Sequence, residues 1–167
     1  MEFEENQNTG TMKVLERHQF DVKALTNFME ENIEGFEGPL AVEEFKGGQS
    51  NPTYLVKAQN QSYVLRRKPP GKLLKSAHAV DREYRVITAL NRTDVPVPTT
   101  YALCEDIEII GTAFYLMEFM EGRVLWDPSM ASSSKGEALG VYTSMNSTLA
   151  KLHSVDPFEL DLESFGR

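Results

Sequence analysis

A short loop of glycines and small polar residues lies between two apolar runs, and it reads Gly47, Gly48, Gln49, Ser50 and Asn51. A loop of this composition can present several backbone N–H groups at once, and such groups bind phosphate oxygens. The same composition is also typical of an ordinary β-hairpin turn. The residues that follow the loop decide between the two interpretations.

A cation and a carboxylate follow this loop at spacings that bring them together. Arg66 lies on a run that predicts a strand, and Arg67 points to the opposite face because side chains alternate along strands. Glu83 lies three residues after Val80 and four before Ile87, on the apolar side of a predicted helix. A carboxylate there needs a cationic partner. We predict that Arg66 and Glu83 form an ion pair that Arg67 does not share. Taken alone, the pattern favours a purely structural pair or an exposed glutamate.

The elements that must position these residues follow in the order helix, three strands, helix, two strands, helix. The first helix begins after Asp21 and ends at Gly35. Strands are predicted over 40–45, 53–58, 63–67, 99–105 and 112–120, and two further helices over 77–90 and 137–153. This order predicts an α+β fold, in which one internal helix covers a five-stranded antiparallel sheet.

Composition narrows the class of protein. The chain has 167 residues, of which 41% are hydrophobic and 25% charged, as in a globular domain. A net charge of −8 argues against nucleic acid or an anionic membrane as the main partner. The single cysteine, Cys104, fits a reducing compartment. With no apolar signal region at residues 1–13 and no run of 18 apolar residues, we expect a cytoplasmic protein.

The spacing of the loop, the arginine and the glutamate matches the phosphate-binding half of a protein-kinase-like fold. In that arrangement the loop N–H groups meet phosphate oxygens, the strand cation holds the α- and β-phosphates, and the glutamate orients the cation. Val64 shares the face of Arg66 and would lie beneath the adenine. An arginine suits this role because its planar guanidinium binds phosphate with two N–H groups.

The segment "FYLMEFMEG" at the last predicted strand resembles a kinase hinge. By that comparison Met117 is the gatekeeper, and the Glu118 carbonyl and the Met120 N–H would bond the adenine edge. Gly122 would loosen the crossover to a second lobe. Taken alone, the segment favours a buried strand that ends in a turn.

Longer segments carry a more specific resemblance. "SNPTY", "YVLRRKPPGKLLKSAHAVDREYRVITAL" and "VPVPTTYALCED…IGTAFYLMEFMEGR" resemble the aminoglycoside phosphotransferase/choline kinase-like family, and in particular its branch that is also found fused to acyl-CoA dehydrogenases. The resemblance covers residues 20–167. It implies a kinase-like N-terminal lobe over 20–120, and over 121–167 the hinge exit and first helix of an incomplete large lobe. It also implies that the glycine loop binds nucleotide, with Ser50 near the β-phosphate. Residues 1–19 are polar and show no periodicity, so we expect a flexible tail there.

The resemblance implies a phosphotransfer reaction, but the sequence lacks the segments that carry its catalytic base and metal ligands in the family. Family members transfer the γ-phosphoryl group of ATP, with Mg²⁺, to a hydroxyl of a small molecule, and the fused relatives suggest a hydroxyacyl-CoA. They carry a later H-G-D-x-x-x-x-N segment and a further metal-binding aspartate, and this sequence has neither. We therefore expect no catalytic base and no metal ligand here, and an inactive N-terminal fragment. The alternative is a non-catalytic nucleotide-binding or interaction module.

The last predicted helix raises two further expectations. His153 and Asp156 in "LHSVD" are the types of residue that serve as a base, but they follow the hinge too closely and predict a helix end. The helix carries an apolar stripe that nothing in the chain covers, so we expect self-association through it. The stripe consists of Leu139, Tyr142, Met145, Leu149 and Leu152.

Overall fold

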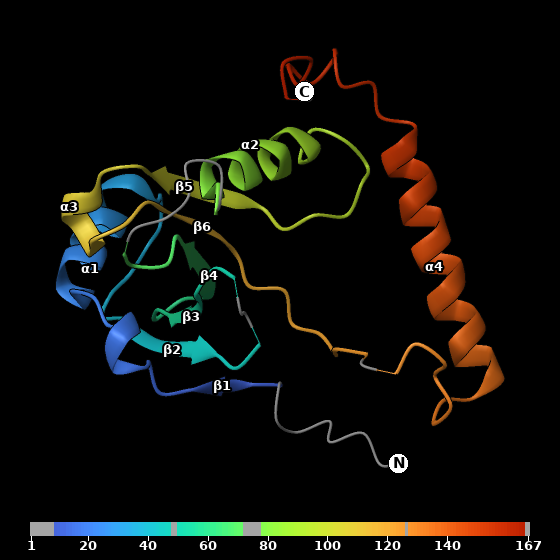
Figure 1. The fold of residues 1–167 in the computed structure, drawn as a ribbon, viewed down its shortest axis with the longest axis horizontal. Coiled ribbons are helices and arrows are strands. Elements are labelled where there is room, and N and C mark those ends of the chain that lie inside the picture. Colours follow the sequence, from blue (N-terminus) through green and yellow to red (C-terminus); the bar gives the residue numbers. More distant parts are fainter. Residues whose placement is uncertain (1–8, 48–49, 72–77, 126, 166–167) are drawn as a thin grey trace.

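The computed structural model describes residues 9–47, 50–71, 78–125 and 127–165. Within them, six antiparallel strands form one sheet in the order β1-β2-β3-β4-β6-β5, with α1 and α2 on its two faces (Figure 1). The strands are β1 Thr11–Met12, β2 Ala41–Phe45, β3 Thr53–Lys57, β4 Ser62–Arg67, β5 Thr100–Cys104 and β6 Phe114–Glu118. The helices are α1 Val22–Asn32, α2 Val80–Leu90, α3 Ile107–Ile110 and α4 Lys135–His153, with a 3₁₀ turn at Glu16–His18.

The sheet has the predicted meander at its centre. β2, β3 and β4 are joined by short connections and pair antiparallel in sequence order. β6 pairs with both β4 and β5, so it is an interior strand, as its apolar run predicts. Its side chains alternate: Phe114 and Leu116 pack in the α1 core, and Tyr115 and Met117 lie in the smaller cluster beside α2. The predicted α+β class and the antiparallel sheet are confirmed.

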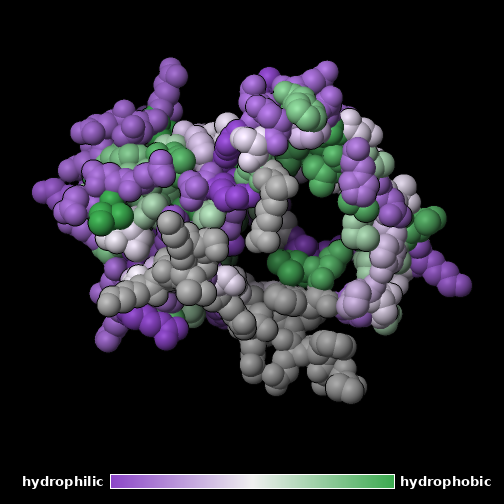
Figure 2. Space-filling model, turned by 45° about the horizontal axis from the view of Figure 1, so that its top comes forward, coloured by the Kyte–Doolittle hydropathy of each residue, from purple (hydrophilic) through white to green (hydrophobic). Residues whose placement is uncertain are grey.

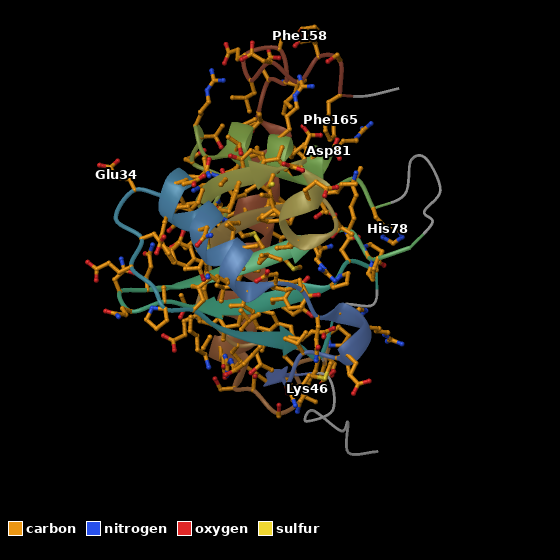
Figure 3. All side chains as sticks on the ribbon, turned by 90° about the vertical axis from the view of Figure 1, so that its left-hand side faces the viewer. Glu34, Lys46, His78, Asp81, Phe158 and Phe165 are labelled. Carbon is orange, nitrogen blue, oxygen red and sulfur yellow. The ribbon has the colours of Figure 1, made fainter. Side chains whose placement is uncertain are left out.

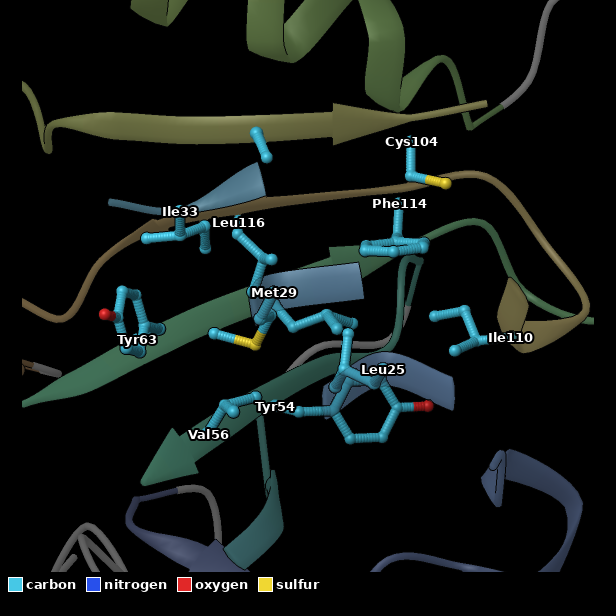
Figure 4. Close-up of a cluster of buried hydrophobic side chains, with 12 residues drawn as sticks. Leu25, Met29, Ile33, Tyr54, Val56, Tyr63, Cys104, Ile110, Phe114 and Leu116 are labelled. Atoms are coloured by element: carbon cyan, nitrogen blue, oxygen red, sulfur yellow. The ribbon is translucent and has the colours of Figure 1, made fainter. Parts of the chain in front are cut away.

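The main core lies between α1 and the sheet (Figure 4). Asp21 caps α1 as predicted, because its carboxylate accepts the N–H groups of Lys23 and Ala24 at 2.8 and 3.1 Å. Leu25 and Met29 are fully buried on the helix face that meets the strands. The other buried members of this cluster are Ile33, Tyr54, Val56, Tyr63, Leu65, Ala102, Cys104, Ile110, Phe114 and Leu116.

The structure corrects the prediction of five strands, and it corrects the flexible tail predicted over 1–19 for residues 9–19; residues 1–8 lie outside the described residues. Residues 11–12 form β1, which pairs with β2 and gives the sheet a sixth strand. The buried carboxylate of Glu44 accepts hydrogen bonds from His18 Nδ1 at 2.6 Å and from the Leu15 N–H at 3.0 Å. These contacts join segments that are far apart in the sequence, and local periodicity cannot reveal them.

The two faces of the sheet are covered unequally. Among the described elements, α2 packs chiefly against β5 and β6 and reaches β4 through the side chain of Glu83, so it leaves much of the face of β2, β3 and β4 on that side bare. The segment after α4 returns to α2, where Leu160 packs with Ala89 and Leu90, and Phe158 and Phe165 lie at this end of the molecule (Figure 3). The uncovered part of the sheet becomes the wall of a cavity.

α4 lies apart from the sheet, at the right of Figure 1, and none of its residues is buried. The predicted apolar stripe is exposed, from 41% for Tyr142 to 69% for Leu139, and Figure 2 shows the surface hollowed beside this helix. The helix ends at His153 as predicted, and Asp156 accepts the Phe158 N–H in the turn that follows. None of the helices in the described ranges combines the length and the apolar character needed to cross a membrane.

Candidate functional site

The predicted ion pair joins β4 to α2. Arg66 Nε donates to Glu83 Oε2 at 2.6 Å, and both side chains are about one-third exposed, at 29% and 35%. A charge-assisted hydrogen bond of this length fixes the relative position of the two groups, although exposure to water reduces its contribution to the stability of the fold. The pair therefore holds the guanidinium in place more than it stabilises the fold.

Arg67 lies on the opposite face of the sheet, as the strand alternation predicts. Its side chain is 2% exposed, and its guanidinium donates to the carbonyl oxygens of Ile110 at 3.1 Å and His18 at 3.3 Å. The rings of Phe20 and Tyr54 lie 5.2 and 5.6 Å from the guanidinium carbon. The register of β4 is therefore confirmed, and Arg66 is the arginine on the side of α2.

Glu83 accepts more hydrogen bonds than the sequence predicts. Oε1 accepts from Asn51 Nδ2 at 3.1 Å, and Oε2 also accepts from the Tyr115 hydroxyl at 3.2 Å. Arg66 Nη1 donates to Thr53 Oγ1 at 3.1 Å. Thr53 and Tyr115 were not among the predicted site residues, but both lie opposite Arg66 in the strand ladders. The strand register is the signal that finds them.

The Tyr115 hydroxyl is held in its neutral form. Burial raises the pKa of this phenol, and the negative charge of Glu83 raises the pKa further. A neutral phenol can donate its O–H to the carboxylate, whereas a phenolate would repel it. Tyr115 therefore acts as a hydrogen-bond donor to Glu83 throughout the physiological pH range.

A cavity of 760 Å³ lies beside the ion pair, over the part of the sheet that α2 leaves bare. Of the predicted site residues, those that line it are Gly47, Val64, Arg66, Met117, Glu118 and Met120. The remaining lining residues are Thr9, Gly10, Thr11, Phe45, Thr53, Leu55, Pro98, Phe119, Glu121, Gly122 and Val124. The structure therefore brings the glycine loop, strand β4 and the hinge segment to one cavity.

Not every predicted residue reaches this cavity. Asn51 and Glu83 lie next to it and act through Arg66 and Thr53, while Ser50 is exposed at the end of the loop. Gly48 and Gln49 lie outside the described residues. The role of each of these residues in binding a nucleotide stays a prediction.

The cavity has an apolar floor and a cation at one end. Leu55 lies opposite Val64 on β3 and β4, and Val64 lies opposite Met117 on β6, so the three side chains form a continuous apolar strip. The next residues along two of these strands on the same face are Thr53 and Arg66. A flat apolar group that carries an anionic tail fits this arrangement.

The hinge segment is fixed where it leaves the sheet. The Glu118 N–H donates to the Thr99 carbonyl at 2.8 Å, and the Glu118 carboxylate accepts the Thr99 N–H at 3.0 Å. Met120 is 58% exposed at the mouth of the cavity. The Glu118 side chain and backbone N–H are therefore both engaged with Thr99, the residue that directly precedes β5.

The described residues do not provide a site for Mg²⁺. Within residues 9–47, 50–71, 78–125 and 127–165, no three His, Cys, Asp or Glu side chains converge on a position that could hold a metal ion. Glu83, the acid beside the Arg66 end of the cavity, already accepts from Asn51, Arg66 and Tyr115. We derive no step through a metal ion.

This chain is similar to known proteins in both sequence and fold. The phosphotransferase enzyme family, APH, matches residues 41–167. A crystal structure of a Ralstonia eutropha JMP134 protein described as an aminoglycoside phosphotransferase superposes with a TM-score of 0.78 at 48% identity, covering 89% of this chain and 43% of that one. The predicted kinase-like fold is confirmed by this match.

Two curated relatives are acyl-CoA dehydrogenases by name. The probable acyl-CoA dehydrogenase IBR3 of Arabidopsis thaliana is 46% identical over 170 residues, which is 96% of this chain and 21% of the relative. Acyl-CoA dehydrogenase family member 11 of Rattus norvegicus is 41% identical over 160 residues, which is 93% of this chain and 20% of the relative. The chain thus spans about a fifth of the length of these relatives. The predicted resemblance to the phosphotransferase family and to relatives named as acyl-CoA dehydrogenases is therefore confirmed. The chain belongs to the phosphotransferase enzyme family.

Proposed function

We propose that this chain binds ATP in the 760 Å³ cavity and forms the nucleotide-binding part of an ATP-dependent small-molecule phosphotransferase. The observation that carries the proposal is the Arg66–Glu83 ion pair at the charged end of an apolar cavity. Arg66 binds the α- and β-phosphates with its free N–H groups, and backbone N–H groups of the glycine loop bind further phosphate oxygens. The ion pair orients the guanidinium before the nucleotide arrives.

The adenine lies on the apolar strip of the cavity. Val64 and Leu55 contact one face of the ring, and Met117 lies at its inner edge. The Glu118 carbonyl and the Met120 N–H bond the polar edge of the base. Burial of the ring and two hydrogen bonds account for the preference for adenine.

The parent reaction is transfer of the γ-phosphoryl group of ATP to a hydroxyl group. The relatives named as acyl-CoA dehydrogenases support a hydroxylated acyl-CoA as the acceptor. In this sequence no H-G-D-x-x-x-x-N segment supplies a base or holds Mg²⁺, so the chain by itself transfers no phosphoryl group. The cytoplasm is the proposed compartment, because the lone Cys104 is a free buried thiol.

A second candidate is a nucleotide-binding or interaction module without catalysis. The lack of converging metal ligands in the part of the chain that the structure describes favours it for this chain. The two candidates differ in whether the downstream segment is needed: a catalytic parent gains turnover when that segment is present, whereas a binding module does not.

Titration of the chain with a fluorescent ATP analogue tests the proposal. We expect saturable binding, and Arg66→Met should weaken it by about 10- to 100-fold because charge-assisted hydrogen bonds to phosphate are lost. A turnover assay with hydroxylated acyl-CoA substrates should show no product from the chain, with a full-length relative as the positive control. Failure of the wild-type chain to bind the analogue would refute nucleotide binding, and turnover by the chain would refute its inactivity.

A further inference from the structure

Asn51, at the end of the glycine loop, has a buried side chain whose amide nitrogen and oxygen both bond to other residues of the protein. Asn51 is 3% exposed, its Nδ2 donates to Glu83 Oε1 at 3.1 Å, and its Oδ1 lies 2.7 Å from His78 Nδ1. Buried amides are found with hydrogen-bond partners because leaving them unpaired is costly. Both ends of this amide therefore have fixed partners, and both partners belong to the α2 region.

The partners fix the orientation of the amide. A carboxylate only accepts hydrogen bonds, so the NH₂ group of Asn51 must face Glu83. Oδ1 then faces His78, which must carry its proton on Nδ1. His78 directly precedes the N-cap residue Ala79 of α2 and has a positive φ of 60°. Asn51 thus holds both the approach to α2 and its first turn.

These contacts close a ring of hydrogen bonds. The backbone carbonyl of Asn51 accepts from Thr53 Oγ1 at 3.0 Å, and Thr53 Oγ1 in turn accepts from Arg66 Nη1 at 3.1 Å. Arg66 Nε donates to Glu83 Oε2 at 2.6 Å. Glu83 Oε1 then accepts from Asn51 and completes the ring. The four residues come from the loop end, β3, β4 and α2. A displacement of α2 must break the bonds of both Arg66 and Asn51 to Glu83.

We infer that Asn51 is a positioning residue that couples the glycine loop to α2, rather than a residue that contacts the nucleotide. The inference rests on the proposed function, since the coupling matters because Arg66 and the loop hold the same ligand. Two bonds to Glu83 keep α2 against the sheet and Arg66 over the cavity. By linkage, a ligand that binds at the loop while Asn51 holds Glu83 also favours this position of α2, and the helix in this position favours the ligand.

Affinities of single and double variants distinguish positioning from contact. Asn51→Ala should weaken binding of a fluorescent ATP analogue by about fivefold or more. In a Glu83→Ala background, which removes the acceptor of the Asn51 amide, the same substitution should add little, because the two residues act through one another. Additive losses would instead make Asn51 a nucleotide contact and overturn the inference. Asn60→Ala is the matched control, because Asn60 also donates one amide hydrogen bond, to the Gly35 carbonyl, from an exposed turn.

Hydrogen exchange of the α2 amides tests the coupling without any nucleotide. Exchange over residues 80–90 should be faster in Asn51→Ala than in the wild type and unchanged in Asn60→Ala. Asn51→Asp is the second variant in case the alanine variant does not fold, and its carboxylate should repel Glu83 and speed exchange as well. Equal exchange in all folded variants would overturn the inference. If the wild type binds no nucleotide but α2 exchanges faster in the variants, the proposed function fails and the coupling stands.

Discussion

Arg66 and Arg67 are adjacent on β4, and their guanidinium groups lie on opposite faces of the sheet, one 2.6 Å from Glu83 and the other bonded to the Ile110 carbonyl at 3.1 Å. The first is partly exposed at the cavity, and the second is buried in the core on the α1 side. Two residues of identical chemistry therefore serve different purposes, and their substitutions should separate binding from stability.

Arg67→Met should lower the free energy of unfolding by about 2–4 kcal/mol, because it removes buried hydrogen bonds to two carbonyl groups. Arg66→Met should lower it by about 1 kcal/mol or less, since the ion pair is partly exposed. Urea unfolding followed by circular dichroism measures both values. The nucleotide affinity should show the opposite order, with the larger loss for Arg66→Met; equal effects of the two variants in either assay would contradict this assignment.

Val64→Phe should fill the adenine end of the cavity. Val64 lies between Leu55 and Met117 and is 7% exposed. We expect affinity for a fluorescent ATP analogue to fall more than about tenfold, and the free energy of unfolding to fall by about 1–3 kcal/mol from overpacking. The affinity for inorganic triphosphate is the control, because Arg66 is untouched. A parallel loss of triphosphate binding would place the damage outside the adenine region.

The exposed stripe of α4 should cause self-association of this chain. Met145 and Leu149 are 56% and 48% exposed near the centre of the stripe. Met145→Glu combined with Leu149→Glu should shift the sedimentation profile to the monomer, because charges on an apolar contact are costly to bury. Ser144→Glu, on the other side of the helix, is the control and should leave association unchanged. A wild-type chain that is monomeric at all concentrations would refute this prediction.

Alkaline pH should destabilise the fold through buried tyrosines. Burial raises the pKa of Tyr54 to about 12, from an ordinary value of 10.0. The unfolded chain releases this proton first, so the stabilising contribution is complete below pH 10 and is lost as pH rises from 10 toward 12. The loss is about 2–3 kcal/mol for this group. Burial also raises the pKa of Tyr115, which acts in the same direction.

Urea unfolding between pH 9 and pH 11.5 measures this effect. Tyr54→Phe should show a smaller fall in unfolding free energy over this range than the wild type. The matched control is Tyr142→Phe, since Tyr142 is 41% exposed on α4. An equal fall in the wild type and Tyr54→Phe would assign the alkaline instability to other groups.

The strands and helices could be predicted from the sequence where their pattern is local. The predicted strand over 63–67 is β4, Ser62–Arg67, because a short apolar run rich in strand-forming residues follows a polar turn. The predicted end of the first helix at Gly35 was late, since α1 ends at Asn32 and Gly35 lies in the following turn with a φ of 74°. β1 and α3 were not predicted, because two and four residues are too short to show a period.

The candidate site could be predicted in part for the same reason. The faces on which Arg66 and Glu83 lie can be predicted from the periodicity of their strand and helix. Their contact follows from the one further assumption that the helix packs on this face of the sheet. Tyr115 and Thr53 join them only through the pairing of β3 and β6 with β4, which no local pattern specifies. The contact between His78 and Asn51 depends on the path of the chain into α2, and neither residue type indicates that path.

Met117 lines the 760 Å³ cavity and also a second cavity of 520 Å³, which extends between Tyr115, Glu83 and Phe165. Arg66 also lines both cavities, so its guanidinium and the flexible side chain of Met117 together separate the two spaces. The length of the side chain at this position sets the shape of compound that can pass from the hinge toward α2. A chain with alanine here would accept inhibitors with a bulky substituent that the natural methionine excludes, which offers a route to selective chemical control of one member of the family.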